Sequence, residues 1–523
     1  MKQSKFFLKW RFAHRSFVHS AEGFKTQIWT SLLGVQLSFL RNFVSSPKLP
    51  RRFLRSSAIC VSVFMFSSLS NAETISLKTG ENIATIVAGA PEGTSFVFSA
   101  GTYHLQQITP KKGDSFAGPA TGMVVLDGAE PIKFSSVAGS SPQLWQASIG
   151  ANPLDLGRCF TGHTLCHYTR ELFVSSTVLM PVASTGQLTA STWFYDSTNG
   201  TAVINFNPGS KTFEIGTSTC AFCGYATNVT IKNLTVERYA SPSQTGAIGG
   251  NGNGAYWTVN NVVGLYNHGG AVQIGANSTV ENSYLHHNGQ KGIGGGGANL
   301  QIVNNEIAYN NYDWFDYGWE AGGAKFGDLN IAEISNNYVH DNNGTGLWDD
   351  GNSIYVHYKS NRIENNAGSG IQHEIGYNSV IEDNTINRNG AAPRISMWDG
   401  QISVQNSTNT VVQNNTVIVA AAYGSGLVIV NQDRGSGTYG PHLGAYDTVE
   451  NNNVTYEGTD GAGGVMGIVA TGVANIIDYN TYHITVGLDK HHFEAFGVKT
   501  FVQFQAAGFD QHGQIVWNAA PAK

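Results

Sequence analysis

Residues 344–384 read GTGLWDDGNSIYVHYKSNRIENNAGSGIQHEIGYNSVIEDN and contain two phrases that nearly repeat. The phrase GLWDD begins 15 residues before Asn361, and the phrase GIQHE begins 14 residues before Asn384. Between them lie short apolar runs, glycine and asparagine. Charged residues that recur at one phase of such a pattern predict a repeat architecture in which equivalent side chains stack on one another.

The repeat extends from about residue 255 and is marked by an asparagine two places before an apolar residue. Most steps are 21–24 residues long, and the asparagines are Asn261, Asn282, Asn305, Asn337, Asn361, Asn384, Asn415 and Asn452. Glycine supplies 62 of 523 residues and charged residues only 13%, which disfavours helices. The pattern predicts stacked coils of short strands, with apolar side chains inside and asparagine ladders along the axis.

Several stretches resemble the right-handed parallel β-helix repeat proteins of the pectate-lyase-like superfamily. They are SFVFSAGTYHLQQITPKKGDSFAG with MVVLDG, VENSYLHHNGQKGIGGGG, NNYVHDNNGTGLW and IENNAGSGIQHEI. The resemblance covers about residues 75–480 and implies an all-β, right-handed parallel β-helix. It implies less about activity, because that superfamily includes polysaccharide lyases, glycoside hydrolases, mannuronan C5-epimerases and non-catalytic adhesins.

The first 72 residues differ from the rest of the chain, with eleven Lys and Arg against one acidic residue. A basic patch at 51–55 precedes the apolar run AICVSVFMFSSL and the sequence SNA at 70–72. This order is typical of a secretory signal, and the apolar run is too short to span a bilayer. We therefore predict cleavage after Ala72 and a secreted or periplasmic protein without a membrane span.

The charge of the remaining chain limits its partners. Residues 73–523 carry 19 Lys and Arg against 35 Asp and Glu, a net charge near −16. Binding to nucleic acid relies on cationic patches that contact phosphates. An acidic chain of this kind excludes nucleic acid as the expected partner.

Four cysteines remain after the predicted cleavage: Cys159, Cys166, Cys220 and Cys223. In an exported chain they predict two disulfides, for which three connectivities are open. A zinc site that includes His163 and His167 is the alternative. The cysteine spacings match no standard zinc finger, which favours the disulfides.

The chain divides into five segments by these patterns. We expect an N-terminal extension with the signal, then an N-terminal cap with the first coils and a short helix in GENIATIVAGA, then a β-rich insertion that holds the cysteines. The regular coils and a C-terminal cap follow. The predicted bounds are 1–72, 73–130, 131–225, 226–486 and 487–523.

Two unusually long loops predict a groove. The distance from a repeat asparagine to the next glycine-led strand is usually nine to eleven residues, but it is 18 from Asn305 to Gly323 and 16 from Asn384 to Gly400. Both loops leave the same corner and flank the coils that contain GLWDD and GIQHE. They should form walls on either side of those coils.

The wall sequences suit a carbohydrate ligand. NYDWFDYGWE at 311–320 is rich in aromatic rings, which can stack on sugar faces, and the second loop adds another tryptophan. We expect the loop NQDRGSGTYGPH at 431–442 to close the far end of the groove. The alternative is that the rings merely cover the coils and that an ordinary surface ion pair occupies the last loop. The candidate binding residues are Trp314, Trp319, Trp398, Asp433 and Arg434.

Strand alternation predicts which residues face the groove. In the strands led by Gly323, Gly346 and Gly370 the next residue is always apolar and should point inward, so the second and fourth point outward. The outward columns contain Lys325, Trp348 and Gln372, then Asp350 and Glu374. Carboxyl groups on strands about 4.8 Å apart disfavour double ionisation and should share a proton. One acid and one carboxylate are what glycoside hydrolysis needs. Glu320 is a third candidate acid.

A register slip of one residue would instead send Asp349 and His373 outward. A histidine base beside an aspartate suits a lyase or epimerase, which removes the proton next to a uronate carboxylate. The catalytic turn of the epimerases resembles YGFDPH, whereas GLWDDG lacks the histidine. The polygalacturonase pattern is also incomplete, because DD is present but NTD and RIK are absent.

Three functions follow, in order of preference. The first is a secreted enzyme that hydrolyses glycosidic bonds in a polysaccharide or oligosaccharide. The second is a uronan lyase or C5-epimerase, and the third is a non-catalytic adhesin or glycan-binding protein. No cofactor is predicted, although the oxygen-rich turn DDGN at 349–352 leaves Ca²⁺ as an alternative without any EF-hand spacing.

Overall fold

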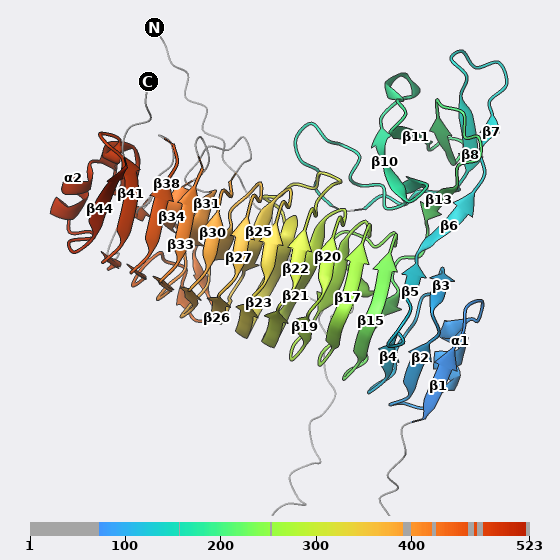
Figure 1. Cartoon of the computed structure of the whole chain (residues 1–523), viewed down its shortest axis with the longest axis horizontal. Helices are drawn as coiled ribbons and strands as arrows, with labels where there is room; N and C mark the ends of the chain where they lie inside the picture. Colours follow the sequence, from blue (N-terminus) through green and yellow to red (C-terminus); the bar gives the residue numbers. More distant parts are fainter. Residues whose placement is uncertain are drawn as a thin grey trace, which may run out of the picture. The chain divides into compact units, whose positions relative to one another are not determined.

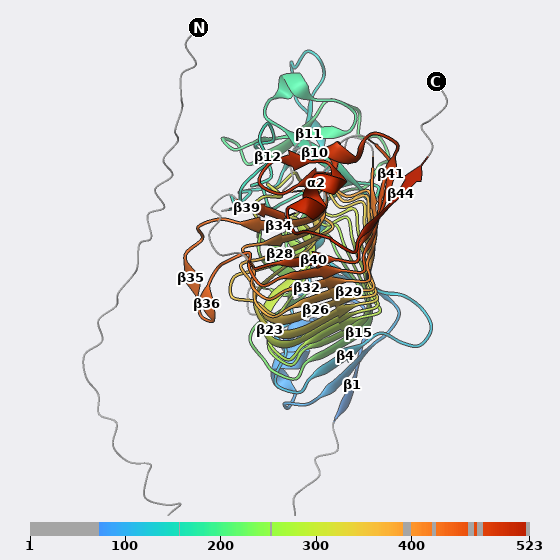
Figure 2. The ribbon, with the colours of Figure 1, turned by 90° about the vertical axis from the view of Figure 1, so that its left-hand side faces the viewer.

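The computed structural model describes residues 73–155, 157–250, 254–390, 399–420, 425–458, 465–467 and 474–518. These residues confirm the predicted fold, an all-β, right-handed parallel β-helix with an inserted β-rich region. Figure 1 shows the coils following one another in chain order, and Figure 2 looks along the stack. The predicted signal and its cleavage site lie outside the described residues. Within the described ranges, no helix is both long and apolar enough to cross a membrane.

The coils build three parallel faces. The glycine-led face contains β16 (Gly246–Gly249), β18 (Gly270–Ile274), β21 (Lys291–Val303), β23 (Gly322–Ser335), β25 (Thr345–Asp350), β28 (Ile371–Glu374), β31 (Gly400–Gln405) and β34 (Ser425–Asn431). The second face contains β17 (Thr258–Leu265), β19 (Thr279–Glu281), β26 (Ile354–Lys359), β29 (Val380–Glu382), β32 (Val411–Gln413), β37 (Thr448–Glu450) and β40 (Ile476–Asp478). The third contains β20 (Tyr284–His286), β22 (Glu306–Ala308), β24 (Tyr338–His340), β27 (Arg362–Glu364), β30 (Thr385–Asn387), β33 (Thr416–Val419), β38 (Asn453–Tyr456) and β41 (Thr481–Thr485).

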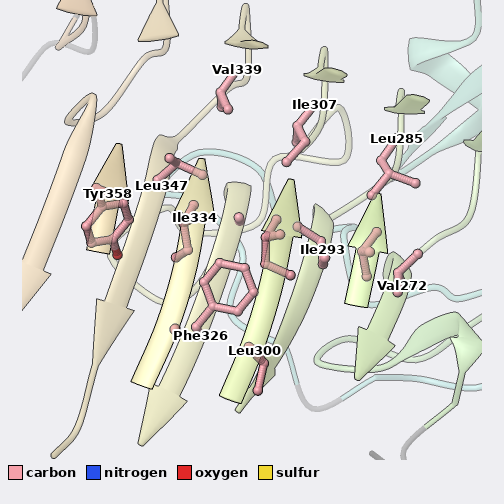
Figure 3. Packing of buried hydrophobic residues seen from close by; sticks show 14 of the residues in the cluster. Val272, Leu285, Ile293, Leu300, Ile307, Phe326, Ile334, Val339, Leu347 and Tyr358 are labelled. Atoms are coloured by element: carbon pink, nitrogen blue, oxygen red, sulfur yellow. The ribbon is translucent and has the colours of Figure 1, made fainter. Parts of the chain in front are cut away.

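Apolar side chains from all three faces fill the inside of the coils. Figure 3 shows part of this core, in which Leu347 and Ile293 come from the glycine-led face and Val339 from the third face. All three are fully buried. Burial of such side chains contributes about 25 cal/mol per Å² of apolar surface, and their regular stacking holds each coil in register with the next.

Asparagine ladders run along the axis, as the sequence predicted. The Asn361 side chain donates to Asn384 at 3.0 Å and accepts from Asn337 at 3.0 Å, and a second ladder passes through Asn342 and Asn366 at 2.8 Å. The residue before each asparagine of the first ladder has a left-handed backbone, with φ of 54–58° from residue 304 to 451. Asn, Asp and Ser tolerate or stabilise such turns, which explains the recurrent NN, SN and DN pairs.

The stack has an N-terminal end with a helix. It contains β1 (Thr74–Leu77), α1 (Ile83–Gly89), β2 (Ser95–Phe98), β3 (Gly101–His104), β4 (Ser115–Ala117) and β5 (Val124–Asp127), before β14 (Phe222–Cys223) and β15 (Thr230–Glu237). The side chain of Asn82 caps α1 by accepting from the Thr85 amide. Ile83 and Val87 of α1 join the main core, so the helix packs on the coils.

The inserted region forms its own eight-stranded, mostly antiparallel sheet. Its strands are β6 (Ala129–Ile132), β7 (Ser135–Ser136), β8 (Trp145–Ser148), β9 (Leu172–Val174), β10 (Thr177–Val182), β11 (Thr192–Asp196), β12 (Thr201–Ile204) and β13 (Phe213–Gly216). A separate apolar cluster around Trp193 supports the sheet. At the other end of the stack, α2 (Phe501–Ala506) precedes β44 (Gln514–Asn518), which pairs with β41.

The four cysteines form two disulfides, Cys159–Cys166 and Cys220–Cys223. This confirms the disulfide interpretation and selects one of the three connectivities. Since the sulfur atoms are bonded to each other, the predicted zinc alternative with His163 and His167 is wrong.

Candidate active site

The register of β23, β25 and β28 determines which side chains leave the coils. Leu347 lies beside Ala324 and Ile371, and all three are buried in the core. Trp348 lies beside Lys325 and Gln372 in the next, outward column. Two residues further on, Asp350 ends β25 and Glu374 ends β28, which places the two carboxylates on neighbouring strands of one outer face.

A cavity of about 330 Å³ lies over this face. It brings together seven of the predicted residues with the loop after Tyr317 and with the next coil. Its lining is Tyr317, Gly318, Trp319, Glu320, Lys325, Thr345, Trp348, Asp350, Gln372, Glu374, Asp399 and Gln405. The seven lining residues that the sequence predicted are Trp319, Glu320, Lys325, Trp348, Asp350, Gln372 and Glu374.

Lys325 is held between a ring and a carboxylate. Its Nζ lies 2.7 Å from Asp350 Oδ2 and 3.5 Å from the centroid of the Trp348 ring. The other oxygen of Asp350 accepts from the Gly351 amide at 2.6 Å. These charge-assisted contacts fix the direction of the Asp350 carboxylate, while its side chain stays 32% exposed to the cavity.

Glu374 is more enclosed and accepts from three donors. Trp348 Nε1 lies 3.2 Å and Gln372 Nε2 3.0 Å from Oε2, while Arg434 donates to Oε1 at 2.8 Å. The Glu374 side chain is only 11% exposed. Arg434 therefore belongs to the surroundings of the candidate site, whereas Asp433 is exposed and its side chain accepts from the Gly435 amide.

Asp349 and His373, the alternative pair, lie inside the coils. Both side chains are fully buried, and His373 Nδ1 lies 2.9 Å from Asp349 Oδ1, which also accepts from the Tyr358 hydroxyl at 2.6 Å. Neither lines the cavity. The slipped register is wrong, because it would bury Asp350 and expose Leu347.

The aromatic wall divides between two places. Trp319 lines the cavity, but Trp314 stacks on His163 at 4.2 Å between ring centroids and lines a different cavity of about 200 Å³. Phe315 is fully buried and pairs with the disulfide-bonded Cys159. The expectation that Trp314 flanks the groove is therefore wrong. Trp398 lies outside the described residues.

Sequence reasoning missed several residues of this region, among them Asp399, Gln405 and Lys291. Asp399 and Gln405 line the cavity from the coil that follows β28. The structure pairs Ile402, not the residue directly after Gly400, with Ile371, so alignment on the leading glycine would have misplaced Gln405. Lys291 is buried and lies 3.9 Å from Glu320 Oε2. Burial lowers the pKa of Lys291 to about 8. The negative charge of Glu320 acts to raise this pKa, and the positive charge of Lys325 lowers it further.

The comparisons with known proteins identify the class of fold. A family model described as the right-handed beta helix region matches residues 246–417. Comparison with curated proteins gave no match. Together with the parallel sheet, the match to the family model shows that the chain folds as a right-handed parallel β-helix.

Solved structures with a similar fold align at low sequence identity, as three examples show. The complex of XylC with xylose aligns with a TM-score of 0.61 and 15% identity, over 83% of this chain and 82% of that one. A structure described as a glycoside hydrolase aligns with a TM-score of 0.47 and 11% identity, over 81% of this chain and 99% of that one. The A-module of the mannuronan C-5 epimerase AlgE4 from Azotobacter vinelandii gives 0.36 and 12%, over 75% and 92%. At these identities the likeness concerns the fold alone.

Proposed function

We propose that this protein is a secreted carbohydrate-active enzyme that hydrolyses glycosidic bonds, with Asp350 and Glu374 as its catalytic residues. One observation carries the proposal: the two carboxylates end neighbouring strands and line the same cavity beside aromatic rings. XylC, a protein of the same fold, was solved in complex with the sugar xylose, which is consistent with a carbohydrate substrate here.

The two carboxylates divide the roles of acid and nucleophile or base between them. Asp350 is bonded to Lys325, and Glu374 accepts from Trp348, Gln372 and Arg434. One of the pair protonates the leaving oxygen, and the other attacks the sugar or activates water. Neighbouring strands lie about 4.8 Å apart, which favours the short carboxylate separation of about 5 Å found in retaining enzymes.

The charge of the cavity favours a neutral sugar. Among the described residues, four carboxylates line it, those of Glu320, Asp350, Glu374 and Asp399. The cations in or beside it are already engaged, because Lys325 is bonded to Asp350, Arg434 is bonded to Glu374 and Lys291 lies near Glu320. A uronate would bring a further negative charge into this lining. A lyase or epimerase must stabilise the uronate carboxylate, so the cavity favours hydrolysis over both.

The experiment is a screen of the purified protein against neutral and uronate polysaccharides and aryl glycosides. We expect new reducing ends from a neutral substrate, without the ultraviolet absorbance of an unsaturated uronate. Anomeric NMR of the first product should show retained configuration. Unsaturated products would favour a lyase, and saturable binding without any product would favour a glycan-binding protein.

A further inference from the structure

A second group of buried ionisable residues lies where the inserted region meets the coils. His268 of the coils is surrounded by Asp155 and Glu171 from the inserted region and by Asp313 from the aromatic loop. His268 Nδ1 lies 3.2 Å from Glu171 Oε1 and 3.1 Å from Asp313 Oδ2, while Nε2 lies 3.7 Å from Asp155 Oδ2. All four side chains are at most 8% exposed.

The negative charge of this group is not balanced by protein cations. Among the ion pairs of the described residues, these three carboxylates pair only with His268. Another pair of carboxylates, Asp127 and Glu214, also lies close to a histidine, but there Arg238 forms an ion pair with each of them and supplies positive charge. Three buried carboxylates around one imidazole cost a large desolvation energy unless further positive charge is present.

Two polar atoms in the group have no hydrogen-bond partner within the described part of the chain. They are Asp313 Oδ2 and His268 Nε2, both buried, although Asp313 Oδ2 points at the His268 ring. The ligand atoms of Glu171, His268 and Asp313 converge within 4.8 Å of one another. Their separations from Nδ1, 3.1 and 3.2 Å, are short enough for the three atoms to be neighbouring ligands of one ion with metal–ligand bonds of about 2.2 Å.

We propose that Glu171, His268 and Asp313 bind a divalent first-row transition-metal ion such as Zn²⁺ or Mn²⁺. One imidazole nitrogen with two carboxylates is a donor set suited to these ions. Nδ1 is the ligand atom, so Nε2 carries the proton and points toward the Asp155 carboxylate. A carboxylate behind the ligating histidine orients the ring, and Ser243 in turn holds Asp155 through its hydroxyl at 2.6 Å.

The ion would join three separate parts of the chain. Glu171 precedes β9 of the inserted sheet, His268 belongs to a coil, and Asp313 begins the loop that ends with Trp319 and Glu320 at the candidate active site. The cavity of about 200 Å³ lined by Asp313 offers a route for the ion. The site is therefore structural, and its loss should loosen the wall of the active-site cavity.

The test measures metal directly, independently of any enzyme activity. Full-length protein is dialysed against chelator, then titrated with ZnCl₂, MnCl₂ or CaCl₂ by calorimetry, with metal content measured by mass spectrometry. We expect one Zn²⁺ or Mn²⁺ per chain and a melting temperature that falls with chelator and returns with either ion. Asp313→Asn and Glu171→Gln should each weaken binding at least tenfold, whereas Asp316→Asn, whose carboxylate pairs with Arg158, should not.

Protein that binds neither Zn²⁺ nor Mn²⁺ and is unaffected by chelator would overturn the proposal, and it would mean that protons balance the charges. Rescue by Ca²⁺ alone would overturn the choice of metal class. If a variant fails to fold, the chelator and titration results on the unaltered protein still decide.

Discussion

At the scale of single residues, the two candidate catalytic carboxylates differ in their neighbours. Asp350 is fixed by a lysine and a backbone amide, and Glu374 by an indole, an amide and a guanidinium group. Amide substitution keeps the shape of each side chain and removes its charge and its proton. The new NH2 group cannot accept from these donors, so each variant loses part of its contacts. Both side chains line a cavity and lie outside the apolar core, so the fold should survive that loss.

Asp350→Asn and Glu374→Gln should each lower the turnover number about 10²–10⁴-fold, because acid–base catalysis contributes that much. The bell-shaped pH profile of the parent should lose one limb in each variant. Steady-state kinetics on the substrate found by the screen measures both effects. Asp341→Asn, an exposed aspartate on another part of the coils, is the control. Near-normal turnover in both variants would move the active site elsewhere.

The two tryptophans of the aromatic loop should behave differently. Trp319 lines the candidate active site, while Trp314 stacks on His163 in another cavity. Trp319→Ala should raise KM roughly tenfold, as expected for the loss of about 1.4 kcal/mol of ring contact with a sugar. Trp314→Ala should leave KM nearly unchanged. Equal effects of the two substitutions on KM would argue against the proposed binding wall.

At the scale of the repeating elements, buried amide ladders stabilise the turns. Asn361 Nδ2 donates to the Ile334 carbonyl at 2.8 Å and to Asn384, and its oxygen accepts from the Asn337 amide at 3.0 Å. Asn361→Ala leaves these buried partners unpaired, so we expect a loss of about 1–3 kcal/mol in the free energy of unfolding. Chemical denaturation measures it. Asn453→Ala, at an exposed position of β38, should cost far less; a similar loss there would contradict a special role for the ladder.

Glu382 on β29 makes a pH-dependent contribution to the stability of the fold. Hydrogen bonds from Lys359, Gln413 and His357 lower its pKa from 4.5 to about 2. A carboxyl group whose pKa is lower in the folded state stabilises the fold above its unfolded pKa. That contribution is lost as the pH falls from about 4.5 to about 2. The difference in melting temperature between parent and Glu382→Gln should therefore vanish across this window. A difference that persists at pH 2 would contradict the assignment.

The repeat made much of the fold predictable. The spacing of the asparagines indicates the coils. The apolar residue after each leading glycine indicates that Asp350 and Glu374 point outward, because side chains alternate between the two faces of a strand. The aromatic loop was harder, because its path depends on Phe315 packing against Cys159 and Cys166 of the distant insertion. Spacing within the loop carries no information about that contact.

At the scale of the whole molecule, the cluster around His268 could not be found from the sequence. Its members stand at positions 155, 171, 268 and 313, without the short spacing of a metal motif. Only the docking of the insertion on the coils brings them together. A different long-range contact, made by the loop at 431–442, places Arg434 against Glu374, 60 residues away in sequence.

A stack of parallel coils has two open ends, and each is a row of unpaired strand edges. At one end Phe501 and Phe504 of α2 are buried in the core, and the Phe501 ring lies 5.8 Å from Tyr482 of β41. These rings do more than fill space, because exposed edges can template pairing with another molecule. Phe504→Asp should therefore turn a discrete species into chains that grow end to end, visible by sedimentation and electron microscopy. Discrete particles that keep their size would contradict this. Phe501 and Phe504 would then prevent polymerisation, because they cover the end of a stack to which further strands could otherwise add.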